Sequence, residues 1–116
     1  MREEIRDIER LNHMLEAINV LINYKDNHTL EEAKSDPIVY FGLVKHVEIL
    51  GEAVYKLTHE FRDRHPVLNW ADIERMRHVL VHGYYKIRPD QLWETIITDI
   101  PAIKPIIEKF VQQEKS

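Results

Sequence analysis

Apolar residues recur every three or four positions along most of the chain, which is the spacing of an amphipathic helix. The first such stretch runs from about Glu3 to Tyr24. Its apolar face consists of Ile5, Ile8, Leu11, Leu15, Ile18 and Ile22. No segment alternates apolar and polar residues over the length of a strand, and no long internal repeat is visible. The pattern therefore predicts an all-helical fold.

Start signals divide the rest of the chain into further helices. Thr29 followed by Glu32 predicts a capping box and a single short helical turn. Asp36 followed by Pro37 predicts the start of a second long helix that runs to about Arg64, because an acidic N-cap with proline at the first helical position is favoured there. Its predicted buried residues are Phe41, Val44, Val47, Ala53, Val54, Leu57 and Phe61.

The last third of the chain predicts two more helices. A third helix should cover Trp70 to about His82, after an Asn69 cap and before a glycine that suits a helix end. A fourth should begin at Pro89 or the next residue, and Pro101 is expected to kink or break it. We therefore expect a single domain over all 116 residues, folded as an up-and-down bundle of four to five helices.

Composition and charge narrow the classes of function. The chain has no cysteine, which excludes disulfides, thiolate zinc sites and a cysteine nucleophile and fits a reducing cytosol. No apolar run is long enough for a secretory signal or a membrane span, so we expect a cytoplasmic protein. The 16 Lys and Arg against 20 Asp and Glu leave a net charge of −4. Proteins that bind nucleic acid through their overall field tend to be basic, so any such role must depend on a local patch.

A local basic patch does lie at residues 75–88, with four cations, no acidic residue, and interleaved histidines and tyrosines. The cations are Arg75, Arg77, Lys86 and Arg88. A helix C-terminus whose cations complement the helix dipole would have the same composition. Arg77 and His82 are about 140° apart around an ideal helix. They can share a cleft only if the helix ends between them or a two-fold partner supplies second copies.

The motif in this patch resembles that of a known family. Arg77 is followed after four residues by His82 and, one residue later, by Tyr84. This spacing resembles the Arg-x4-His-x-Tyr motif of the HEPN-domain ribonuclease toxins of the HepT family. The surrounding chain is similar as well, at Ile49-Leu50-Gly51-Glu52-Ala53, at His65-Pro66 and Trp70, and at Trp93 and Asp99-Ile100-Pro101. The resemblance covers about residues 11–110 and implies a helical HEPN fold that acts on RNA.

The resemblance also implies roles for the motif residues. Arg77 and His82 are the implied catalytic pair, since an imidazole can move a proton and a guanidinium can hold a phosphate in bidentate geometry. His78, Arg75 and Lys86 are expected to bind or orient the substrate. The attacking group is the 2′-hydroxyl of the RNA itself, so we expect no metal and no cofactor, and no cleavage of DNA.

Tyr84 has a separate implied role. By resemblance, a minimal nucleotidyltransferase antitoxin of the MntA type transfers AMP to this tyrosine, and the added phosphate would compete for Arg77 and repel RNA. A tyrosine packed over the helix end is the structural alternative, and Tyr85 is the next candidate acceptor. We also expect a homodimer, because a two-fold interface at the motif helix would bury Val79, Val81 and Tyr84 and form a shared cleft.

Two other interpretations stay open. Glu74, His78 and His82 form a stripe at helical spacing that suits zinc, nickel or manganese, which Glu48 and Glu52 could complete from the second helix. A surface pair between glutamate and histidine would give the same spacing. The chain could also be a non-catalytic HEPN module that binds nucleotide or regulates a nucleotidyltransferase.

Overall fold

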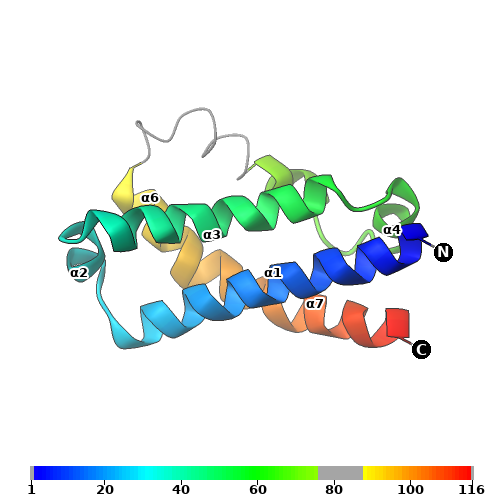
Figure 1. Ribbon diagram of the computed structural model, residues 1–116, viewed down its shortest axis with the longest axis horizontal. Coiled ribbons are helices and arrows are strands. Elements are labelled where there is room, and N and C mark those ends of the chain that lie inside the picture. Colours follow the sequence, from blue (N-terminus) through cyan, green and yellow to red (C-terminus); the bar gives the residue numbers. More distant parts are fainter. Residues whose placement is uncertain (1, 76–87, 116) are drawn as a thin grey trace.

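The computed structural model describes residues 2–75 and 88–115, and every regular element in these ranges is helical. Three long helices pack as a bundle: α1 (Arg2–Asn27), α3 (Pro37–Tyr55) and α7 (Ile100–Lys115). Helix α1 lies between the other two and contacts both (Figure 1). Within the described ranges, no helix is long and apolar enough to cross a membrane. The predicted all-helical bundle is confirmed.

The core fills the space between the three long helices. On α1, four residues of the predicted apolar face point inward: Leu11 and Ile18 are fully buried, and Leu15 and Ile22 pack against the core. Phe41 was predicted to lie on the buried side of α3, and this is wrong, since its side chain is 54% exposed. It lies nine residues before Leu50, which is fully buried. At about 100° per residue, side chains nine positions apart point in opposite directions.

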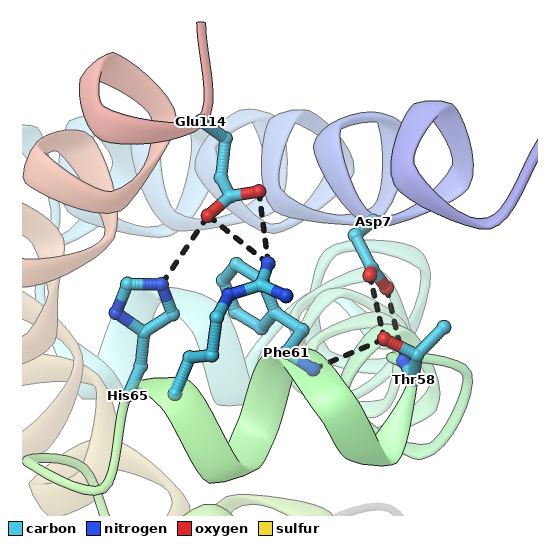
Figure 2. A network of polar contacts seen from close by, with 6 residues as sticks. Asp7, Thr58, Phe61, His65 and Glu114 are labelled. Atoms are coloured by element: carbon cyan, nitrogen blue, oxygen red, sulfur yellow. Dashed lines mark hydrogen bonds and ion pairs between the residues drawn. The ribbon is translucent and has the colours of Figure 1, made fainter. Parts of the chain in front are cut away.

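The second long helix that we predicted to extend to Arg64 is in fact two helices, α3 and α4 (His59–Arg64). The break comes at Thr58, whose hydroxyl accepts a hydrogen bond from the backbone N–H of Phe61 at 3.1 Å and so caps α4. The carboxylate of Asp7 on α1 accepts hydrogen bonds from the Thr58 N–H at 2.9 Å and from its hydroxyl at 2.7 Å (Figure 2). Asp7 is only 3% exposed, and a buried carboxylate requires such partners.

The other end of α4 is attached to α7. Glu114 accepts hydrogen bonds from Arg64 at 3.2 and 3.3 Å, and its second oxygen lies 3.3 Å from Nε2 of His65 (Figure 2). Next to this contact, aromatic rings from three segments pack with centroids about 6 Å apart. They are Phe61, Trp70 and Phe110. Helix α4 is therefore fixed by α1 where it begins and by α7 where it ends.

At the opposite end of the bundle, local caps start the helices as the sequence predicted (Figure 1). In the capping box of α2 (Leu30–Lys34), the Glu32 N–H donates to Thr29 Oγ1 at 3.2 Å and the Thr29 N–H donates to Glu32 Oε1 at 2.8 Å. This backbone donor lowers the pKa of Glu32 below its ordinary value. Asp36 caps α3 by accepting from the N–H of Ile38 at 3.0 Å.

The last helical stretch contains a widened turn. Helix α6 (Pro89–Glu94) begins at Pro89, as predicted, and a π-helical segment, η2 (Thr95–Asp99), joins it to α7. The N–H of Ile100 donates to the carbonyl five residues back, and Pro101, which follows, has no N–H to donate. The distortion expected at Pro101 therefore takes the form of a π-turn just before it, and the helix continues through that proline.

The π-turn also keeps the apolar residues of this stretch on one side. Leu92, Ile96 and Ile100 are buried and spaced four apart. In an ideal α-helix each such step drifts by about 40° around the axis. A turn that takes in more residues reduces this drift, so all three side chains can reach the same core.

Candidate functional site

The motif residues predicted to carry the chemistry lie outside the described ranges. They are Arg77, His78, His82, Tyr84 and Lys86, together with Val79, Val81 and Tyr85. Arg75 is the last described residue before the motif, and Arg88 is the first one after it. The structure therefore describes how the chain enters and leaves the motif, and the roles of the motif residues stay predictions.

The segment that enters the motif is attached to the core and to α4. Residues 70–75 are helical, and Trp70 is 6% exposed, with its indole N–H donating to the carbonyl of His65 at 2.8 Å. One residue before Arg75, Glu74 accepts a hydrogen bond from Arg62 at 3.1 Å. A buried aromatic ring and an ion pair thus fix the backbone directly ahead of the predicted site.

The segment that leaves the motif is also anchored at once. Arg88 has extended backbone geometry at the N-cap of α6, and Pro89 takes the first helical position, where a missing N–H costs nothing. Leu92 enters the core at 4% exposure, and the ring of Trp93 meets Tyr24 edge-on at 6.3 Å. Twelve residues, 76–87, therefore join two points that are each fixed to the bundle.

The charges that flank the motif are partly neutralised from just outside the patch. Arg75 forms an ion pair with Asp72, one turn earlier on its helix, and Arg88 donates to Asp90 at 3.3 Å. Both arginines are about two-thirds exposed. Such exposed pairs contribute little to stability, so either arginine can exchange its carboxylate for a phosphate at low cost. Counting charges only between residues 75 and 88 overlooks these two acidic partners.

The carboxylates of the metal alternative each have a cationic partner. Glu74 pairs with Arg62, Glu48 lies 3.3 Å from Lys45, and Glu52 lies 3.5 Å from Nζ of Lys56. Among residues 2–75 and 88–115, no group of three or more histidine and acidic side chains is placed to hold a metal ion. The two histidines of the predicted stripe lie outside these ranges, so the metal-free reaction stays a prediction.

A second polar region, which the sequence did not single out, lies between α1 and α3. It is a groove of about 440 Å³, which we call the α1–α3 groove. Its lining residues are Arg10, His13, Glu16, Ala17 and Val20 on α1, and Lys45, His46, Ile49, Glu52, Ala53 and Lys56 on α3. The two halves are more than twenty residues apart in the sequence, so only the pairing of the helices reveals them as one surface.

The described residues form a small helical bundle in which two anchored segments flank a basic motif. Comparisons with known sequences identify the family. The model of a family described as "Ribonuclease HepT-like" matches residues 14–110. This chain therefore belongs to the HepT-like ribonuclease family.

Individual relatives agree with this assignment. The chain is 34% identical to "Putative RNase TTE0752" of Caldanaerobacter subterraneus subsp. tengcongensis, over 90% of this chain and 94% of that protein. It is 31% identical to "Probable ribonuclease HepT" of Thermococcus cleftensis, over 85% and 90%. It is 32% identical to "Putative RNase MJ1216" of Methanocaldococcus jannaschii, over 92% and 89%. No solved structure matches the chain significantly.

Proposed function

We propose that this protein is a metal-independent endoribonuclease toxin that cleaves RNA with Arg77 and His82 in a cleft shared by two copies of the chain. One observation carries the proposal. The family match spans residues 14–110, and this span contains Arg77, His82 and Tyr84 in the spacing of the family motif. A permanently charged guanidinium and an imidazole are the two side-chain types that this reaction requires.

The reaction follows from the chemistry of RNA. His82 accepts the proton of the substrate's 2′-hydroxyl, and the freed oxygen attacks the adjacent phosphorus. The bond from phosphorus to the 5′-oxygen breaks, that oxygen takes up a proton, and a 2′,3′-cyclic phosphate is left. Arg77 binds the phosphate oxygens on which negative charge accumulates. His78 orients the substrate or carries the second proton, while Arg75 and Lys86 bind flanking phosphates.

The described structure supports this proposal through its anchors. The backbone is fixed at Trp70 and Glu74 before the motif and at Leu92 after it. Catalytic side chains need a backbone that is held in place on both sides, because a displacement of about 1 Å lowers the rate of catalysis strongly. Pairing two copies around a two-fold axis would bring both basic patches to one cleft in a protein whose net charge is negative.

The proposed regulation acts on Tyr84. A nucleotidyltransferase antitoxin binds the toxin and transfers AMP from ATP: the phenol oxygen bonds to the α-phosphate, pyrophosphate leaves, and the phenol proton is released. The added anion occupies Arg77 and repels the RNA backbone. Intact-mass measurement after incubation with a cognate antitoxin and ATP should show the gain of one AMP. No gain, or a gain that persists in Tyr84→Phe, would contradict this part of the proposal.

The direct test of the activity is cleavage of transfer RNA with and without EDTA. Wild-type protein should cleave equally in both, whereas Arg77→Ala and His82→Ala should lose about 10²-fold or more of the rate. His59→Ala is the matched control, because this histidine is exposed at the start of α4, away from the motif in the sequence. Wild-type rates in His82→Ala, or activity that EDTA abolishes, would refute the mechanism.

The shared cleft needs a test of its own. Light scattering at micromolar concentration should give the mass of two chains. A monomer that cleaves RNA at the full rate would contradict the two-fold site and leave the assignment of Arg77 and His82 intact.

A further inference from the structure

The α1–α3 groove contains one arginine, Arg10 on α1. The Nε atom of Arg10 is buried and has no hydrogen-bond partner, and no ion pair joins this side chain to a carboxylate in the described part of the chain. An unsatisfied buried donor lowers the stability of a folded protein, so its presence calls for an explanation. A ligand that draws the guanidinium outward would satisfy it.

The groove around Arg10 is rich in hydrogen-bond donors. Three cations and two carboxylates line it. Nζ of Lys56 lies 3.5 Å from Glu52, and Nζ of Lys45 lies 3.3 Å from Glu48, which stands just outside the lining. Arg10 is the one cation of this lining for which the described residues show no ion pair. Two histidines lie in the lining as well. Nδ1 of His46 lies 2.7 Å from the carbonyl of Gly42 and can donate to it, which leaves Nε2 for another contact.

The size and lining of the groove indicate a ligand larger than a small anion. Its volume of about 440 Å³ exceeds what one phosphate group fills, and apolar side chains line part of it. These are Ala17, Val20, Ile49 and Ala53. Lys45 and Lys56 are eleven residues apart, or about 16 Å along the axis of α3. A chain of phosphates can reach both lysines, with its sugars and bases on the apolar part, whereas a single anion cannot.

From these observations, we propose that the α1–α3 groove binds a phosphodiester of the RNA substrate away from the cleaved bond, with Arg10 as the main phosphate ligand. A guanidinium offers two parallel donors to a phosphate, and it is less strongly hydrated than an ammonium group. The identity of the strand as substrate rests on the proposed ribonuclease function, but the binding itself does not. Arg10 is a binding residue and takes no part in the bond cleavage.

The test measures binding without catalysis. A fluorescent twelve-nucleotide RNA with 2′-O-methyl groups throughout has no attacking hydroxyl, so anisotropy reports affinity alone. Arg10→Gln should weaken binding about 5- to 10-fold and lower the slope of log affinity against log salt by about one. Arg10→Lys keeps the charge without the paired donors and should fall in between. Lys34→Gln, which removes an exposed cation outside the groove, should change affinity less than 2-fold.

Three outcomes would overturn the groove as an RNA site. The first is an Arg10→Gln protein that binds the oligonucleotide as wild type does. The second is an Arg10→Gln protein whose RNA affinity is unchanged but whose oligomeric state, measured by light scattering, differs from that of wild type. This result would assign the groove to a second copy of the chain. The third is stabilisation by inorganic phosphate in a thermal shift that depends on Arg10 while RNA affinity does not.

A cleavage assay separates this proposal from the proposed function. On long RNA, Arg10→Gln should raise KM about 5- to 10-fold and leave kcat unchanged, because the residue acts in binding only. Arg10-dependent binding by a wild-type protein that cleaves no RNA would contradict the ribonuclease and support the groove. Cleavage with a KM that is unaffected in both Arg10 variants would support the ribonuclease and refute the groove.

Discussion

The two ends of the bundle are held together in different ways. At the end that carries both termini (Figure 1), contacts join residues about fifty positions apart, such as Asp7 with Thr58 and Arg64 with Glu114. At the end that carries α2, most of the contacts are caps that join residues two or three positions apart, such as Thr29 with Glu32, beside one edge-on ring contact between Tyr24 and Trp93. At this end the side chain of Ile38 is 86% exposed, so it adds little to the core.

This difference separates two kinds of stability. Local caps form within a single turn, so they determine where helices start and contribute about 1 kcal/mol each. Contacts between distant segments form only when the bundle is complete, and their loss leaves buried groups unpaired or a cavity behind. We therefore expect substitutions at the α4 end to destabilise the whole fold, and matched substitutions at the α2 end to have small effects.

The largest expected effect is that of Phe61→Ala. This side chain is fully buried and contacts both Trp70 and Phe110, so its removal should lower the free energy of unfolding by about 3–5 kcal/mol. Phe41→Ala is the matched control at the other end, where the ring is 54% exposed, and should cost less than about 1 kcal/mol. Urea denaturation measures the free energy of unfolding of both variants, and equal losses would contradict the expected difference between the two ends of the bundle.

Asp7→Ala should come next, at about 2–3 kcal/mol. It leaves both the N–H and the hydroxyl of Thr58 without their acceptor inside the protein, and buried unpaired donors are costly. Asp36→Ala removes the same residue type from an exposed helix cap and should cost about 1 kcal/mol. Thermal unfolding of the two variants should show the larger drop in Tm for Asp7→Ala, and the reverse order would count against it.

A smaller effect is expected from Glu114→Gln. The neutral amide loses the ion pair with Arg64 and changes the contact with His65, although part of the hydrogen bonding can persist, so we expect a loss of about 1 kcal/mol. Glu108→Gln changes an exposed carboxylate on the same helix and should be almost neutral. Hydrogen exchange should also quicken in α4 in Glu114→Gln alone. Protection that is unchanged there would show that the α7 contact does not fix α4.

The smallest effect concerns Glu32 and depends on pH. Its folded-state pKa is lowered, chiefly by the backbone N–H of Thr29, so its contribution to stability is present above the unfolded-state pKa and is lost as the pH falls through the folded value. Glu32→Gln should thus be slightly less stable than wild type at pH 7. The gap in Tm should close as the pH falls below about 4.5, and a gap that is constant with pH would refute the capping role.

The features that the sequence predicted correctly are the local ones. Thr29, Asp36 and Pro89 start helices as expected, because the groups that cap a helix lie within the same turn. The break at Thr58 was missed: its own cap on Phe61 is local, but the contact with Asp7 that holds Thr58 in place comes from 51 residues away. A side chain that is buried by tertiary contact gives no signal in its own neighbourhood.

The features of the candidate site also fall into two groups: those that the sequence shows and those that only the folded chain shows. The spacing of Arg77, His82 and Tyr84 is visible in the sequence, and the family match confirms the membership that it indicated, while the roles of these residues stay predictions. The ion pair between Arg62 and Glu74 and the burial of the Arg10 Nε atom without a hydrogen-bond partner among the described residues depend on which helices pack together. They became apparent only in the folded chain.

The π-turn at Thr95–Asp99 affects how this chain is compared with its relatives. Each residue in a helix rotates the following ones by about 100°. A relative with one residue fewer between Glu94 and Ile100 would have an ordinary α-helical turn there, and α7 would still meet α1 with the equivalent side chains, because the wider turn absorbs the extra residue locally. Alignments therefore have to place any single-residue gap inside this turn, and positions matched across it without that step would pair core residues with surface ones.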